Sequence, residues 1–270
     1  MRACWLLCLG ACNWVYGLDQ TRLPDPPGPD AAPRCSASGA LAFSPRVTQA
    51  VIQECSDYTI QGTMAIAECG SGFLTTKLAG GPVDAPLVPI DIAATRLNAH
   101  LVAPRLTPDG DLIVHQEVFP GRSSVASVYR RDGEGWTWQS DLPFALPPFA
   151  RAGMPSKGPR RHLMVTYADR IEEAVDDGTG NWTTTSSPFS ALGVTKVNSA
   201  IHLSADGLRA VFTGATTLPE VRYAVRSRID APFEGSFPLT VPAAMDAYLT
   251  EDCSRLYFSG LGSIFYVPQL

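Results

Sequence analysis

Three short segments share one pattern: Leu106-Thr-Pro-Asp-Gly110, Leu203-Ser-Ala-Asp-Gly207 and Leu249-Thr-Glu-Asp-Cys253. Two residues after each of them a short apolar run begins. Asp-Gly favours a turn that needs a positive φ. An apolar run without alternation indicates a strand that is covered on both faces. Each segment is therefore predicted to be a turn that leads into a buried strand.

The segments recur with a period near 46 residues. Gly110 and Gly207 are 97 residues apart, and the second and third segments are 46 apart, so one more unit is expected within the longer gap. That unit holds Leu163-Met-Val165, preceded by Ser156-Lys-Gly-Pro159 in place of Asp-Gly. Met64–Ala67 is a fifth, weaker unit.

A second feature recurs with the same period. Gly133-Glu-Gly-Trp136 leads to a Leu-Pro-Phe segment that ends at Phe144, and Gly178–Trp182 leads to a Ser-Pro-Phe segment that ends at Phe189. The two phenylalanines are 45 residues apart. Two independent features with one period indicate a structural repeat of that length.

Repeats of 40–50 residues with several short strands have the size of propeller blades. We therefore predict that residues 35–270 form an all-β β-propeller of about five four-stranded blades, or six if some blades are degenerate. Ring closure would need an N-terminal strand, from Ala40–Phe43 or Val47–Ile52, beside the C-terminal strand Ser263–Val267. The best helix candidate, Arg170–Val175, is only about a turn and a half long.

The repeat resembles the WD40-like repeat of TolB-type propellers. That signature is Leu-Ser/Thr-x-Asp-Gly, two residues, and an apolar-aromatic run that ends in Ser or Thr, and Leu203–Thr213 and Leu249–Ser259 match it. The resemblance covers roughly residues 40–270, and it departs from the signature where Cys253 replaces the glycine. It implies the fold and says little about function, because propellers have many roles.

Residues 1–11 have the order of an export signal, with an early basic residue, an apolar stretch and small residues before the cleavage point. Leu9–Cys12 resembles the lipobox of bacterial lipoproteins, which implies that Cys12 is the lipid-attachment site. In that family Asn13, in place of an aspartate, implies the outer membrane. A plain secretory signal is the alternative. Residues 12–34 would then be a lipidated N-terminus and a proline-rich, extended tether.

Four cysteines remain beyond the predicted anchor: Cys35, Cys55, Cys69 and Cys253. In an oxidising compartment an even number suggests two disulfides, for which three connectivities exist. We favour Cys55–Cys69 as a local bond and Cys35–Cys253 as a clasp between the N-terminal part and the last blade.

The composition and the motifs exclude several functions. The net charge is −5 and no long basic run occurs, which argues against a nucleic-acid partner. We find no nucleophile elbow, P-loop, dinucleotide fingerprint or metal-ligand spacing. No catalytic, cofactor-binding or metal-binding residue is therefore assigned, and the chain is expected not to be an enzyme.

Residues that could carry chemistry have simpler interpretations. The histidines are expected to be structural, the repeated aspartates to form turns, and the tryptophans to pack between blades rather than to stack on sugars. These residues are His100, His115, His162, His202, Asp109, Asp206, Asp252, Asp132, Asp177, Asp230, Trp136, Trp138 and Trp182.

The first functional hypothesis is a lipid-anchored, non-enzymatic module of the bacterial cell envelope that binds an envelope protein or a glycan. The alternatives are a propeller hydrolase or lyase that acts on polysaccharide, and a structural subunit of an envelope complex. An enzyme would need two or three carboxylates or histidines that converge at one channel mouth, away from the turns.

Overall fold

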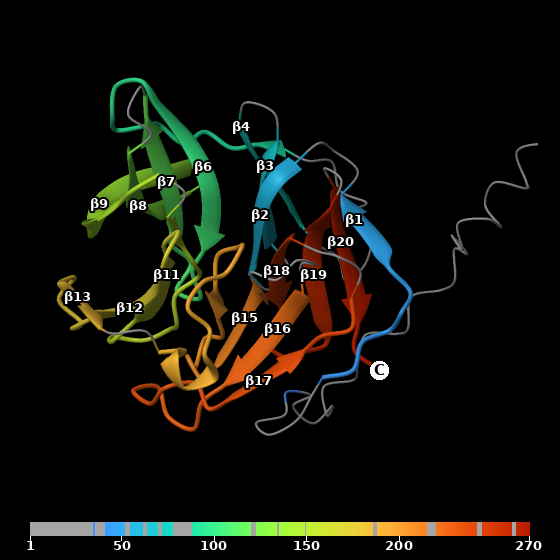
Figure 1. Ribbon diagram of the computed structural model, residues 1–270. Coiled ribbons are helices and arrows are strands. Elements are labelled where there is room, and N and C mark those ends of the chain that lie inside the picture. The colour runs from blue at the N-terminus through green and yellow to red at the C-terminus, as the bar shows by residue number, and fades with distance from the viewer. Residues whose placement is uncertain are drawn as a thin grey trace, which may run out of the picture. The chain divides into compact units, whose positions relative to one another are not determined.

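The computed structural model describes residues 35, 41–51, 55–61, 64–69, 72–77, 88–119, 123–133, 135–148, 150–185, 188–214, 220–241, 245–260 and 263–270. These residues form five antiparallel sheets of four strands each, arranged in a ring (Figure 1). The chain is therefore a β-propeller, as the repeat predicted. Among the described residues, no helix has the length and apolar character needed to cross a membrane.

Four blades are formed by consecutive strands. The first has β2 Cys55–Gln61, β3 Met64–Cys69, β4 Gly72–Lys77 and β5 Val88–Pro89; the second has β6 Ala99–Leu106, β7 Leu112–Val118, β8 Ser123–Asp132 and β9 Gly135–Leu146. The third has β10 Arg151–Ala152, β11 His162–Thr166, β12 Ile171–Asp176 and β13 Trp182–Thr185; the fourth has β14 His202–Leu203, β15 Arg209–Gly214, β16 Glu220–Val225 and β17 Gly235–Pro238. A short 3₁₀ helix, η1 Ser190–Leu192, precedes the fourth blade.

Both ends of the propeller chain build the fifth blade. Its strands are β18 Met245–Leu249, β19 Arg255–Gly260 and β20 Ser263–Pro268, and β1 Thr48–Val51 pairs antiparallel with β20. Phe43 adds a single bridge to Gln269. The predicted ring closure is confirmed, and the closing strand comes from the second of the two expected segments.

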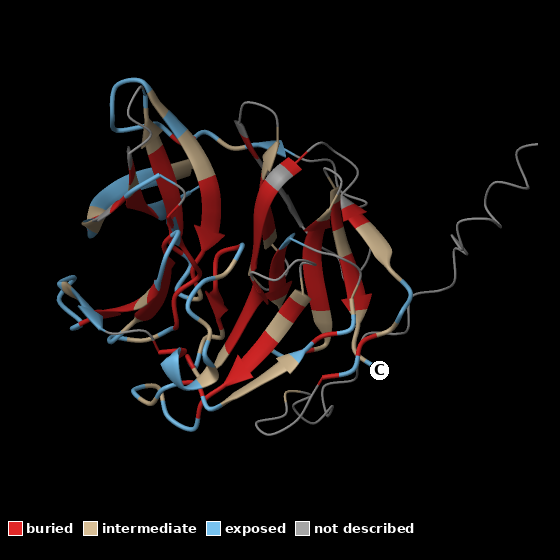
Figure 2. Ribbon diagram, in the orientation of Figure 1, coloured by how far each residue is buried: buried red, intermediate tan, exposed pale blue. Residues whose placement is uncertain are grey.

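The apolar runs of the repeat are inner, doubly covered strands. All five residues of β11 are buried, and the central residues of β15 and β19 are buried too (Figure 2). Clusters of buried residues lie between neighbouring blades, as where β11 meets the hairpin of β8 and β9. The segment 170–175, the best but very short helix candidate, lies in the inner strand β12, in which five of six side chains are buried, so the all-β prediction is confirmed.

The three repeat segments fold into the same turn. In each, the last residue donates its backbone N–H to the carbonyl three residues earlier, over 2.8–2.9 Å. Gly110 and Gly207 have positive φ values of 87° and 70° there, and Cys253 has 57°. Asp206 and Asp252 accept backbone N–H groups within these turns. The repeat aspartates therefore form turns, and Cys253 occupies a glycine position.

Two disulfides join the four cysteines as favoured from the sequence. Cys35 bonds to Cys253 and Cys55 bonds to Cys69. The first links the N-terminal part to the turn of the last blade, next to the strand pairing that closes the ring. The predicted signal (1–11), the tether (12–34) and Cys12 lie outside the described residues.

Removal of the Cys35–Cys253 bond should cost more stability than removal of Cys55–Cys69. The first closes a sequence separation of 218 residues and the second one of 14, which corresponds to about 5 and about 3 kcal/mol of chain entropy. We expect this order in the free energies of urea unfolding of the paired Cys→Ser variants.

In a Cys35→Ser background, the Cys253→Gly variant should be about 1 kcal/mol more stable than the Cys253→Ser variant, because the backbone at residue 253 has a positive φ. Equal stability would contradict the glycine-like role of Cys253.

Gly153→Ala should disrupt the contact between the third and fourth blades. A Cβ atom at Gly153 would lie 1.8 Å from the carbonyl oxygen of Ile201, which is a backbone atom. We expect a loss of roughly 2–3 kcal/mol or more, measured as a fall in Tm. Gly135→Ala is the control, because its Cβ atom would have only an ordinary contact at 3.8 Å. A Tm for Gly153→Ala equal to that of the control would show that the interblade contact is not this close.

Candidate functional site

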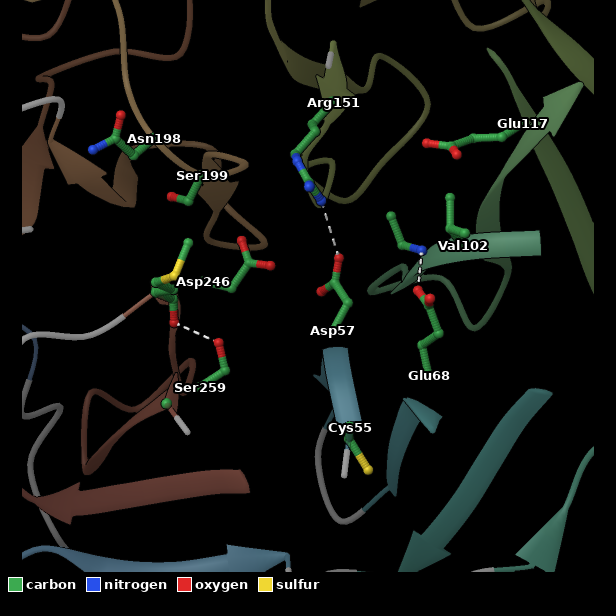
Figure 3. A pocket seen from close by; sticks show the side chains of 13 residues that line it. Cys55, Asp57, Glu68, Val102, Glu117, Arg151, Asn198, Ser199, Asp246 and Ser259 are labelled. Carbon is green, nitrogen blue, oxygen red and sulfur yellow. Dashed lines mark hydrogen bonds and ion pairs between the residues drawn. The ribbon is translucent and has the colours of Figure 1, made fainter. Parts of the chain in front are cut away.

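A cavity of about 390 Å³ opens at one end of the central channel (Figure 3). The wall of the cavity lies on the face of the propeller at which the first strand of each blade begins. Every blade contributes to it: Asp57 from β2, Ala103 from β6, Arg151 from β10, Ser199 just before β14 and Asp246 from β18. The repeat turns lie at the other ends of these strands, so this is the channel mouth rather than a turn surface.

Two irregularities in the inner strands shape this mouth. The pairing of β6 shifts register between Val102 and Arg105, and that of β18 shifts between Met245 and Tyr248. Within these bulges Ala103 and Asp246 have positive φ values of 52° and 44°. Such conformations are unfavourable for residues other than glycine and gather at functional sites. Bulges also re-aim side chains, and this one directs Asp246 into the cavity (Figure 3).

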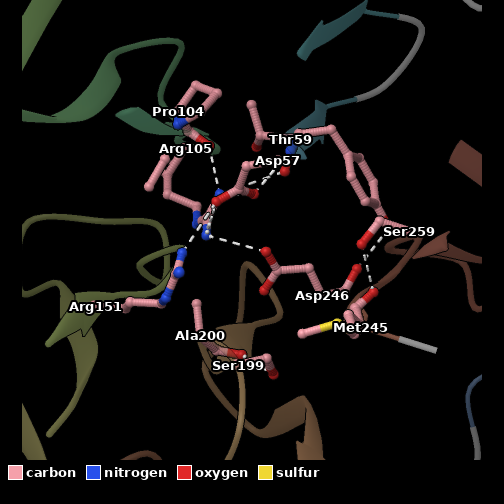
Figure 4. A network of polar contacts seen from close by, with 12 residues as sticks. Asp57, Thr59, Pro104, Arg105, Arg151, Ser199, Ala200, Met245, Asp246 and Ser259 are labelled. Carbon is pink, nitrogen blue, oxygen red and sulfur yellow. Dashed lines mark hydrogen bonds and ion pairs between the residues drawn. The ribbon is translucent and has the colours of Figure 1, made fainter. Parts of the chain in front are cut away.

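A fully buried guanidinium lies beneath the cavity (Figure 4). Arg105 has no solvent exposure and binds Asp57 through two parallel contacts, Nη1–Oδ1 at 2.7 Å and Nη2–Oδ2 at 3.1 Å. Its Nη2 also lies 3.9 Å from Oδ2 of Asp246. Arg105 thus joins carboxylates from the first and fifth blades, the two blades between which the ring closes.

Asp57 is a carboxyl group with a perturbed pKa. Burial raises its pKa, the charge of Arg105 lowers it, and the charge and a hydrogen bond of Asp246 raise it again, with a net upward shift. Asp57 and Asp246 are therefore a coupled pair of carboxyl groups, a type of arrangement that supports acid–base chemistry.

Arg151 stands at the centre of the cavity. Its side chain is 45% exposed, and its Nη1 lies 3.4 Å from Oδ2 of Asp57. This is its one ion pair among the described residues, and its guanidinium extends into the cavity toward Asp57 (Figure 3).

Two further carboxylates line the same wall. Glu68 accepts the backbone N–H of Ala103 through Oε2 at 3.0 Å, which fixes the bulge of β6. Glu117 comes from β7, and its carboxylate has no hydrogen bond or ion pair with any described residue. The hydroxyl groups are already engaged: Ser199 donates to the carbonyl of Ala200, and Ser259 donates to that of Met245. Acidic groups, and not serine nucleophiles, are therefore available.

A smaller cavity of about 60 Å³ adjoins the larger one. It shares Val102, Ala103, Glu117 and Arg151 with it, and adds three residues, His115, Pro148 and Ala150. His115 is buried, and its Nε2 lies 3.2 Å from the backbone N–H of Ala152. Burial, and then the charges of Arg105 and Arg151, lower the pKa of His115 to about 3.

The other histidines lie away from the mouth. His162 is buried and its Nδ1 is 2.7 Å from Oε1 of Glu173, which also contacts the guanidinium of Arg226. His202 is buried against Tyr248, and burial lowers its pKa to about 3. His100 is exposed and packs edge-on to Phe119.

The remaining candidates from the sequence have structural positions. Asp177 accepts the backbone N–H of Thr179, and Asp230 lies near Arg228 in a loop. Trp136 and Trp182 pack against core clusters. The packing interpretation is wrong for Trp138, which is 43% exposed and donates to Asp141.

Sequence motifs missed the channel mouth because its residues come singly from separate blades. A signal was nevertheless present. Ala103, Arg151 and Asp246 each stand seven residues before the turn residue of their own blade, which is Gly110, Gly158 or Cys253. The same offset in the repeat therefore marks the position that faces the mouth.

Within the part of the chain that is described, no three His, Cys, Asp or Glu residues are grouped to hold a metal ion. The acidic groups of the mouth are separated by Arg151 and Arg105. What the arrangement offers is a set of carboxylates beside a partly exposed guanidinium.

No family model and no curated protein matches the chain. Among solved structures, it is similar to a gluconolactonase from Xanthomonas campestris, with 16% identity over 77% of this chain and 69% of that one, at a TM-score of 0.44. It is also similar to regucalcin, a calcium-binding protein of Agrobacterium tumefaciens (13% identity, 78% and 75% covered, TM-score 0.47), and to the Dos1 propeller (10% identity, 78% and 67% covered, TM-score 0.42). At these identities the likeness shows the propeller fold alone.

The expectation that the chain is not an enzyme is wrong. Carboxylates from several blades converge at one channel mouth away from the turns, which is the arrangement that an enzyme would need. The error has a physical origin: the motifs that we searched for are contiguous in sequence, whereas these side chains are brought together by ring closure.

Stability should fall as the pH is lowered from 6.5 towards 4. In the unfolded chain His115 and His202 take up protons near pH 6.5, whereas in the folded protein their pKa is about 3. Folding stability is therefore lost as the pH falls through this window, by up to about 1.4 kcal/mol per histidine and pH unit. Urea unfolding at several pH values measures this slope. His202→Gln should lower the number of protons taken up on unfolding by about one and should therefore reduce the slope of stability against pH. An unchanged slope would contradict the neutral state of this histidine.

Proposed function

We propose that the protein is a hydrolase that acts on carbohydrate-derived esters or lactones at the channel mouth. The observation that carries the proposal is the coupled pair Asp57 and Asp246 beside the partly exposed guanidinium of Arg151. The lining includes four carboxylates and the amide of Asn198, and such groups hydrogen-bond to the hydroxyl groups of a sugar.

Each group has a role in this reaction. Asp246 removes a proton from water, whose oxygen attacks the carbonyl carbon, and Arg151 donates hydrogen bonds to the oxyanion that develops. The proton is held by the Asp57–Asp246 pair and passes to the leaving oxygen as the carbon–oxygen bond breaks. Arg105 is a positioning residue, because it orients Asp57 and does not line the cavity.

Cleavage of a glycosidic bond, as in a polysaccharide hydrolase, is the second candidate. The raised pKa of Asp57, which has Asp246 as a carboxylate neighbour, favours it, since glycosidases use one protonated and one ionised carboxyl group. Arg151 argues for the ester or lactone, because a cation stabilises an oxyanion and opposes a developing oxocarbenium ion.

The place of action remains part of the proposal. The lipobox at Leu9–Cys12 and the TolB-like repeat support an exported protein, anchored through Cys12 in the cell envelope and by preference in the outer membrane. Its substrate would be a neutral glycan derivative of that compartment. An accompanying role within an envelope complex is compatible with this anchor.

A pH-stat assay of the purified full chain tests the activity, with glucono-1,5-lactone as substrate and aryl glycosides as the second panel. We expect lactone turnover above the uncatalysed rate. Asp246→Asn and Arg151→Gln should each reduce kcat/KM by roughly 100-fold or more.

The matched control is Asp169→Asn, whose carboxylate is 75% exposed and remote from the mouth, and this variant should keep full activity. Turnover of aryl glycosides alone would select the second candidate. A rate equal to the uncatalysed one on both panels would refute the hydrolase.

A further inference from the structure

The small cavity beside the channel mouth has a mixed lining. Pro148, Ala150, Val102 and Ala103 supply apolar surface, while His115, Glu117 and Arg151 supply one polar group each. Its volume of about 60 Å³ exceeds the roughly 10–15 Å³ that a water molecule needs. A group of two or three non-hydrogen atoms with one polar end fits such a space.

His115 provides a hydrogen-bond donor there. Its Nε2 accepts the backbone N–H of Ala152, so the ring proton of the neutral imidazole is on Nδ1. No described residue pairs with this Nδ1, and the atom is not among the fully buried polar atoms that lack a partner. It is therefore open to the small cavity that His115 lines, where a ligand oxygen can accept its hydrogen bond.

Glu117 provides the complementary acceptor. Its carboxylate has no hydrogen bond or ion pair with a described residue and lines both cavities. A hydroxyl group can accept from His115 and donate to Glu117 at the same time. A carboxylate cannot donate to Glu117, and the charge of Glu117 opposes the attraction that Arg151 exerts on an anionic group.

We propose that this side cavity is a specificity subsite for the hydroxymethyl group of a neutral sugar. The CH₂ lies against the apolar wall and the hydroxyl bridges His115 and Glu117. The inference rests on the proposed hydrolase for its catalytic readout, and it names the substrate class: hexose derivatives with a free primary alcohol, in preference to pentose derivatives, uronates and 6-phosphates.

Two measurements on the purified full chain test the subsite. The first compares kcat/KM for glucono-1,5-lactone, xylono-1,5-lactone, which lacks the hydroxymethyl group, and 6-phosphoglucono-1,5-lactone. The second measures binding of glucose, xylose and glucose 6-phosphate by NMR titration, which needs no turnover. We expect at least a tenfold preference for the hexose over the pentose and over the phosphate, in both measurements.

Two variants separate the subsite from a structural role. Ala150→Val fills the cavity and should abolish the preference for the hexose while leaving the pentose unaffected. Glu117→Gln keeps the side-chain size and should improve the relative binding of glucose 6-phosphate at least tenfold. Glu234→Gln, on an exposed residue far from the cavity, is the matched control and should change neither ratio.

The outcomes distinguish the two proposals. Equal hydrolysis of both neutral lactones would leave the hydrolase in place and refute the subsite. If no lactone is hydrolysed but glucose binds more tightly than xylose, the hydrolase is refuted and the subsite is supported. Absence of both hydrolysis and sugar binding would refute both.

Discussion

The buried contact between Arg105 and Asp57 is the interaction on which the rest of the molecule depends. It places a guanidinium with no solvent exposure between the first and second blades, within 3.9 Å of a carboxylate of the fifth. A buried charge is tolerated only where its partners compensate for lost hydration, so both carboxylates must be held in place. The side chain of Arg105 thereby fixes the relative positions of the three inner strands β2, β6 and β18. The same side chain supports the floor of the channel mouth.

The channel mouth departs from regular strand geometry at the points where its chemistry lies. The left-handed conformations of Ala103 and Asp246 interrupt β6 and β18, and Glu68 and Ser259 hold the two bulges through hydrogen bonds to the backbone. Regular pairing would turn these positions away from the opening, because side chains alternate along a strand. The unfavourable backbone is therefore the means by which an acidic group reaches the cavity.

The sequence was informative where the fold repeats and uninformative where it does not. The same turn sequence recurs in three of the five units, so the period near 46 residues predicted the blades, the closure and the clasp between Cys35 and Cys253. The site is made of single residues such as Asp57 and Arg151, which share no type and meet only in the ring. The segment 170–175 was the best helix candidate for a different reason: a doubly covered strand loses the alternation that distinguishes it from a helix.

Closure of the ring by both chain ends also sets an order of events during folding. Cys35 and β1 find their partners, Cys253 and β20, only after more than 200 further residues exist. Until then the first blades can form, but β1 has an unpaired edge, and that edge is a template for contacts between chains. Long-range closure of this kind is slow. The synthesis of β18 to β20 therefore controls when the protein stops being prone to aggregation, and loss of these strands would leave β1 unpaired as well as destroy the fifth blade.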